Sequence, residues 1–173
     1  MKRFILTALC MLAVAGASAQ KKLAATDSII VAGLVKQPFV ITSTQVQQQA
    51  VQDLGDIVIR NHAGEYKSTE KNVKAASLLP LMQAAVPNLS SPRLYSECYF
   101  VMEATDGYRV VFSWNEIFNT AVGKQLWLIV EANGKRWNEL PDRMLLLCTA
   151  DNNTGRRHVK SLSRIVLKRV GDE

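Results

Sequence analysis

The C-terminal part of the sequence gathers positive charge. Six cations and no acids lie between Asn152 and Val170, namely Arg156, Arg157, Lys160, Arg164, Lys168 and Arg169. Guanidinium and ammonium groups donate charge-assisted hydrogen bonds, so such a cluster can bind a phosphate or another small anion. The same residues would also suit the solvent-exposed face of a strand. Their spacing alone leaves both interpretations open.

Two cysteines and two histidines are the other reactive side chains of residues 20–173. Cys98 and Cys148 each lie in an apolar run, where they could form a disulfide bond in an oxidising compartment or remain buried thiols. Neither has a second sulfur or a histidine at the spacing of zinc ligands, so the sequence predicts no zinc site. Neither His62 nor His158 lies in a nucleophile motif, and no G-x-S-x-G occurs, which argues against a hydrolase.

The first 19 residues have the three parts of a secretory signal peptide. Lys2 and Arg3 form a basic start, residues 4–14 are apolar, and Ala17-Ser18-Ala19 is a small-residue cleavage site. The apolar run is shorter than the about 20 residues needed to span a bilayer. We therefore expect cleavage near Ala19-Gln20, a single domain over residues 20–173, and a periplasmic or secreted protein that does not span the membrane. Loss of Lys2 and Arg3 lowers the formal net charge from +6 to +4.

Turn signals and hydrophobic patterns predict the elements that position these side chains. Asp106-Gly107 between two alternating runs predicts a hairpin, because glycine adopts positive φ angles easily. Ser113 and Glu116 fit a capping box, so we interpret Glu116 as a helix cap rather than a general acid. The remaining pattern predicts helices over residues 45–51 (capped by Thr42 or Ser43) and 78–86 (capped by Ser77), a loop over 61–71, and strands over 29–35, 39–41, 57–59, 95–103, 108–112, 126–131, 144–148 and 162–170. Many short strands with few short helices indicate an α+β domain with a mixed, mostly antiparallel sheet.

Five segments in order resemble the molybdopterin-binding domain of the sulfite oxidase family. They are VAGLVKQPFVITSTQVQQ, NVKAASLLPLMQAAVP, ATDGYRVVFSWNEI, LIVEANGKRWNELPDRMLLL and GRRHVKSLSRIVL. The resemblance extends from about Val31 to Val170, and Ser161 stands where the family has a tryptophan. It implies a sulfite-oxidase-type α+β fold that holds a pyranopterin in a cleft.

The resemblance also implies an anion site. It places four residues where the family has polar and basic groups near the phosphate and pterin of the cofactor, namely Arg143, Arg157, His158 and Lys160. Backbone N–H groups beside Gly155 would add donors for a phosphate. Each of these residues could instead make an ordinary surface or strand-end contact.

The family's molybdenum-ligating cysteine has no counterpart in this sequence. The corresponding stretch, IVIRNHAGEYKSTEKNVK, offers Asn61 and His62 but no thiol. A soft thiolate suits a metal that transfers oxygen atoms, so its loss argues against molybdenum chemistry. The signal peptide also lacks the twin arginines that direct export of folded, cofactor-loaded chains, and an unfolded chain has no preformed cofactor site.

We therefore expect an exported module that binds a small anion or a partner protein and carries no cofactor. The alternative is a molybdopterin-dependent oxidoreductase, or a subunit of one. In it, Asn61 or His62 replaces the thiolate, or the pterin sulfurs and oxo groups hold the metal alone. Nucleic-acid binding is not expected, because the net charge is modest and the aromatic residues do not interleave with the basic run.

Overall fold

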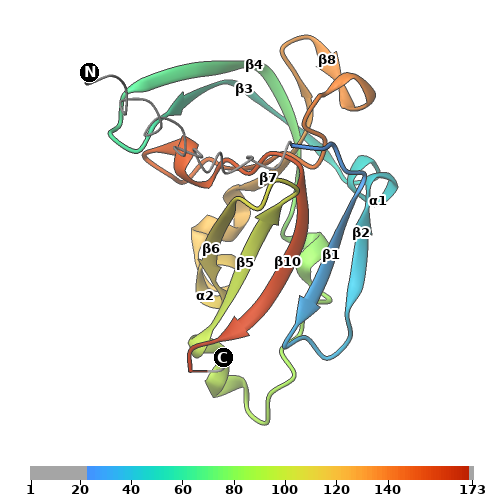
Figure 1. Ribbon diagram of the computed structural model, residues 1–173, viewed down its shortest axis with the longest axis vertical. Coiled ribbons are helices and arrows are strands. Elements are labelled where there is room, and N and C mark those ends of the chain that lie inside the picture. The colour runs from blue at the N-terminus through green and yellow to red at the C-terminus, as the bar shows by residue number, and fades with distance from the viewer. Residues whose placement is uncertain (1–22, 172–173) are drawn as a thin grey trace, which may run out of the picture.

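Two five-stranded β-sheets, joined by short helical turns, make up the computed structural model, which describes residues 23–171 (Figure 1). The predicted signal peptide lies outside the described residues. Within them, no helix has the length and hydrophobicity needed to cross a membrane.

The first sheet is mixed, because one of its strand pairs is parallel. Its strand order is β2-β1-β10-β5-β6; β1 and β10 run parallel, and the other neighbours are antiparallel. This agrees with the predicted mixed, mostly antiparallel arrangement. The strands are β1 (Ser28–Gly33), β2 (Phe39–Thr42), β5 (Cys98–Ala104), β6 (Arg109–Ser113) and β10 (Leu162–Arg169).

The second sheet carries a long two-stranded ribbon. Its order is β3-β4-β7-β8, with β9 paired to β7, and all pairs are antiparallel. Only residues 74–77 of β4 pair with β7, so the rest of β3 and β4 extends as a ribbon that arches across one end of the molecule (Figure 1). The strands are β3 (Val51–Arg60), β4 (Tyr66–Ser77), β7 (Leu126–Ala132), β8 (Lys135–Arg136) and β9 (Leu146–Cys148).

The helices are all short. The α-helices are α1 (Ser43–Gln47) and α2 (Trp114–Phe118), and the 3-10 helices are η1 (Pro80–Met82), η2 (Pro92–Glu97), η3 (Ala121–Gln125), η4 (Trp137–Glu139) and η5 (Thr154–Arg157). Both α-helices begin with a capping box. The Ser113 hydroxyl accepts from Glu116 N at 3.1 Å, and Glu116 Oε2 accepts from Ser113 N at 2.7 Å, as predicted. Thr42 and Gln45 make the equivalent pair at α1.

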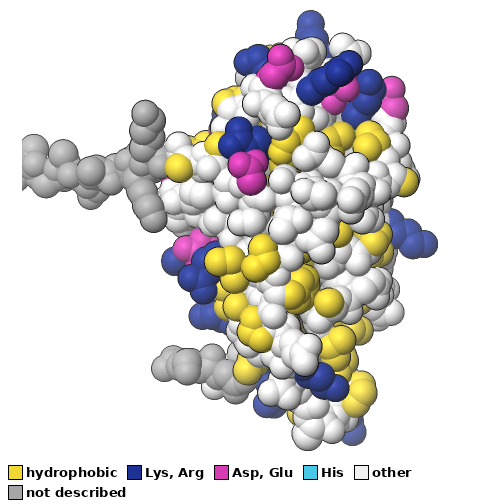
Figure 2. All heavy atoms as spheres, turned by 90° about the vertical axis from the view of Figure 1, so that its right-hand side faces the viewer, with side chains coloured by type: hydrophobic (Ala, Val, Ile, Leu, Met, Phe, Trp, Pro, Cys, Tyr) yellow, Lys and Arg dark blue, Asp and Glu magenta, His cyan; other side chains and the backbone are white. Residues whose placement is uncertain are grey.

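The hydrophobic core has two parts. The larger cluster includes Phe100, Phe112 and Ile165 of the first sheet, while the smaller cluster includes Ile59 of the ribbon and Ile129 of β7. Strand β5 alternates buried and half-buried residues along its whole length, because successive side chains point to opposite faces of a sheet. Figure 2 shows charged side chains gathered at the end that carries β8, and hydrophobic side chains spread over the side that β1 and β2 form.

The predicted helix over residues 78–86 is wrong, because only η1 forms there. Ser77 ends β4, where it pairs with Trp127, and η1 begins after Leu79 without a side-chain cap. The Leu78 N–H donates to Leu126 O, and Pro80 has no N–H to donate. Leu78 and Met82 are still fully buried, so their hydrophobicity reflects core packing rather than helical periodicity.

The predicted loop over residues 61–71 is also wrong in its second half. Strand β4 begins at Tyr66, and β3 spans ten residues where the sequence predicted a strand over residues 57–59. Both strands are polar because much of the ribbon faces solvent. Register shifts near Gly55 break the regular alternation, which concealed the strand from pattern analysis.

Candidate functional site

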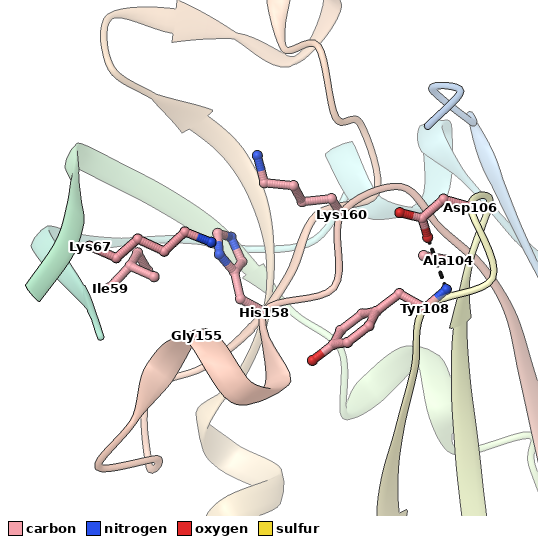
Figure 3. A pocket seen from close by; sticks show the side chains of 8 residues that line it. All are labelled: Ile59, Lys67, Ala104, Asp106, Tyr108, Gly155, His158 and Lys160. Carbon is pink, nitrogen blue, oxygen red and sulfur yellow. Dashed lines mark hydrogen bonds between the residues drawn. The ribbon is translucent and has the colours of Figure 1, made fainter. Parts of the chain in front are cut away.

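A basic groove lies between the ribbon, the β5–β6 turn and the segment that follows η5. It consists of two adjoining cavities of about 290 Å³ each, which share Lys67, Tyr108 and Gly155. The first is also lined by Ile59, Ala104, Asp106, His158 and Lys160, and the second by Asn61, His62 and Arg156. Figure 3 shows Lys67 approaching from the ribbon and Tyr108 from the opposite wall, with His158 and Lys160 between them.

Positive charge exceeds negative charge along this groove. Lys67, Arg156 and Lys160 line it, while Asp106 is the one carboxylate among the lining side chains. Lys160 Nζ donates to Asp142 Oδ2 at 2.8 Å, which offsets part of its charge. Lys67 is exposed and makes no ion pair with any described residue, so its ammonium group remains able to bind an anion.

Tyr108 joins the hairpin turn to η5. Its hydroxyl donates to Arg156 O at 2.6 Å, and its N–H donates to Asp106 Oδ1 at 2.9 Å. The predicted Asp-Gly hairpin is confirmed, with Gly107 at a φ of 91°. The turn therefore holds one wall of the groove against the segment that carries the cations.

Gly155 is required by close packing against the ribbon. A Cβ atom at this position would lie 2.4 Å from the carbonyl oxygen of Arg60. Beside it, the Thr154 hydroxyl donates to Val58 O at 2.8 Å and accepts from Arg60 N at 3.1 Å. Because Gly155 has no side chain, η5 can pack closely against β3, and this contact sets the width of the groove.

His158 is held as a neutral imidazole. Burial is the main cause that lowers its pKa to about 4, and the nearby Lys160 and Lys67 lower it further, against the opposing effect of Glu70. Its Nε2 atom is buried and has no hydrogen-bond partner among the described residues. His158 therefore supplies no charge to an anion at neutral pH.

Arg157 lies outside the lining of the groove. Its guanidinium donates to both carboxylate oxygens of Asp151, from Nε at 2.9 Å and from Nη2 at 2.5 Å, and its Nη1 donates to Glu116 Oε1 at 2.8 Å. The same group stacks 3.9 Å from the centre of the Phe112 ring. The arginine implied as a phosphate ligand is thus engaged in fixing η5 to α2 and to the loop after β9.

The pKa values of this cluster reflect that engagement. The hydrogen bond with Asp151 raises the pKa of Arg157 against the opposing effect of burial. Burial favours a higher pKa for the Glu116 carboxyl, but hydrogen bonds from Arg157 and Ser113 outweigh it and hold that pKa below its usual value. Arg157 and Glu116 are therefore both charged at neutral pH.

Arg143 also makes an ion pair away from the groove. Its Nε donates to Asp27 Oδ1 at 2.6 Å and its Nη2 to Asp27 Oδ2 at 3.1 Å. Of the residues that the resemblance implied, the structure brings Gly155, His158 and Lys160 together and leaves Arg143 and Arg157 outside. Sequence analysis did not single out Lys67, because this residue was assigned to a loop.

The side chains at the implied metal position do not fit a thiolate-ligated molybdenum. The Asn61 amide is occupied within its own turn, where its oxygen accepts from Ala63 N at 2.9 Å and its nitrogen donates to Glu65 Oε2 at 2.8 Å. Cys98 and Cys148 are buried in different sheets, are not joined by a disulfide bond and do not line the groove. Among residues 23–171, no group of three or more His, Cys, Asp and Glu side chains could hold a metal ion.

The two sheets and the few short helices define an α+β domain of the sulfite-oxidase type. A particular solved structure with this fold is the sulfane dehydrogenase SoxCD from Paracoccus pantotrophus, with a TM-score of 0.55 and 17% sequence identity over 84% of this chain. The match spans 39% of the SoxCD chain. At this identity the likeness establishes the fold alone. No protein-family model and no curated protein matches the sequence.

Proposed function

We propose that the protein is an exported anion-binding module on a sulfite-oxidase-type fold, acting without molybdenum redox chemistry. The observation that carries this proposal is the basic groove, in which three cations face one carboxylate. Export is inferred from the N-terminal signal sequence alone.

The groove has the chemistry that an oxyanion requires. Lys67 and Lys160 line the same cavity, and Lys67 has no competing carboxylate among the described residues. Arg156 is exposed, and its one hydrogen bond to a described residue from the guanidinium is a long contact of 3.4 Å from Nη2 to His62 O. Lys67 and Arg156 can turn toward an anion without breaking a strong ion pair, whereas Arg157 would have to leave two carboxylates.

The absence of molybdenum chemistry is supported by the donor set. Oxygen-atom transfer by a thiolate-ligated metal needs a soft sulfur at the site, and the groove presents amine, guanidinium, imidazole and phenol groups instead. We therefore assign the module an accessory or binding role rather than an enzymatic one.

Isothermal titration calorimetry at low ionic strength, with inorganic phosphate and with sulfate as ligands, tests the proposal by measuring their affinities. Lys67→Gln should weaken binding several-fold, since an exposed charge pair contributes about 0.2–1 kcal/mol. Lys168→Gln is the matched control, because Lys168 is exposed on β10, away from the groove. Equal affinity in wild type and Lys67→Gln would contradict the proposed site.

The alternative is a molybdopterin-dependent oxidoreductase with an altered ligand. One observation favours it, namely that Asn61 and His62 line the second cavity. Metal analysis of protein purified from its native host distinguishes the two functions. Stoichiometric molybdenum that is lost in His62→Ala would establish the oxidoreductase and refute the accessory module.

A further inference from the structure

The basic groove continues beyond Lys160 into a third cavity. This cavity has a volume of about 160 Å³ and shares Lys160 with the first one. Arg156, Lys67, Lys160 and Lys135 thus follow one another along three adjoining cavities. A single phosphate fills a small part of this length.

The chemistry of the groove changes along its course. The third cavity is lined by Leu140, Pro141 and Leu145, together with two carboxylates that already have partners. Asp142 accepts from Lys160, and Glu70 accepts from the Asn133 amide. Lys67 and Arg156, which make no ion pair with a described residue, therefore lie in the first two cavities, and the third adds Lys135 and an apolar wall.

We infer that the natural occupant is an extended acidic segment of a partner polypeptide, which places carboxylates against Lys67 and Arg156 and one apolar side chain against Leu140 and Leu145. The inference rests on the proposed anion-binding function and names the source of the anion. It follows from charge complementarity and from the continuity of the three cavities.

The weakness of each single contact favours a segment over a free ion. Lys67, Arg156 and Lys135 are all exposed, and an exposed charge pair improves affinity by at most about fivefold. A free oxyanion contacts one or two of these groups. A chain that carries several carboxylates can contact these cations together. Once one carboxylate is bound, the others bind within the same complex, so the affinity of the segment exceeds that of a single contact. An apolar side chain in the third cavity adds affinity that salt does not screen.

The probe is a fluorescein-labelled peptide of four glutamates and one leucine, prepared with the leucine at either end. Fluorescence anisotropy with the mature protein gives the Kd of each peptide, and competition with inorganic phosphate gives the Kd of phosphate. At least one of the two peptides should bind tenfold or more tightly than phosphate. Replacing the four glutamates by glutamines should abolish binding, and replacing the leucine by serine should weaken it several-fold. Raising the salt concentration should also weaken the binding of the acidic peptide.

The decisive variant is Lys67→Gln combined with Arg156→Gln, which should lower the affinity for the peptide about tenfold. Its charge-matched control is Lys36→Gln combined with Lys168→Gln, because both lysines are exposed and outside the groove. Equal weakening by the control, or equal binding of the glutamine peptide, overturns the inference. If phosphate binds at Lys67 and neither peptide binds more tightly, this inference alone fails; if neither phosphate nor peptide binds, the proposed function fails with it.

Discussion

Replacing Arg157 by alanine should destabilise the protein by about 3 kcal/mol while leaving phosphate affinity almost unchanged. Removing one partner of a buried ion pair costs about 3–5 kcal/mol, whereas an exposed pair contributes about 0–1 kcal/mol. The side chain of Asp151 is 13% exposed and that of Glu116 is 35% exposed, so the first contact lies near the buried limit and the second nearer the exposed one. For a domain of this size, 3 kcal/mol corresponds to about 6–12 °C in Tm.

Urea denaturation followed by tryptophan fluorescence measures this change. Arg164→Ala is the control, since Arg164 is exposed on β10 and should change the free energy of unfolding by about 0.5 kcal/mol at most. A double-mutant cycle with Asp151→Ala should show strong coupling, because both variants remove the same bidentate contact. If Arg157→Ala is as stable as wild type but loses phosphate binding, then Arg157 is an anion ligand and the structural role assigned to it is wrong.

Three further predictions concern His158, Gly155 and Cys148. His158 has a pKa of about 4 in the folded protein against an ordinary value of 6.5, so the unfolded chain takes up its proton first as the pH falls; stability should decline from about pH 6.5 to pH 4 by at most about 3 kcal/mol. Urea denaturation at several pH values should show a shallower decline for His158→Gln, and an unchanged decline would contradict this. Gly155→Ala should destabilise the protein by about 1–3 kcal/mol and weaken phosphate binding, because the added Cβ meets Arg60 O at 2.4 Å; a stable variant with normal affinity in thermal and calorimetric assays would show that η5 can move freely. Burial raises the pKa of Cys148 to about 11, so this thiol should react with a disulfide reagent at pH 8 far more slowly in the native protein than in urea, and equal rates would exclude the buried position.

Local signals in the sequence were sufficient for several elements. Ser113 with Glu116, and Asp106-Gly107, each act on backbone groups within a few residues, so this capping box and this hairpin could be predicted without knowledge of the fold. For α1 the sequence predicted a cap at Thr42 or Ser43 and a helix over residues 45–51, whereas Thr42 caps a helix that ends at Gln47. Alternation likewise predicted the buried strand β5. The ribbon could not be predicted in this way, because its strands are polar and bulged and depend on pairing between distant residues.

By itself, the sequence determined the α+β class, the positions of most strands along the chain and the presence of a basic C-terminal segment. Tertiary structure alone decided which of those cations face a groove and which face carboxylates. Arg156 and Arg157 are neighbours in the chain, yet one lines the groove and the other joins Asp151 and Glu116. The reason is that an ion pair depends on the distances in space between segments such as η5, α2 and the loop after β9, and local residue spacing does not determine those distances.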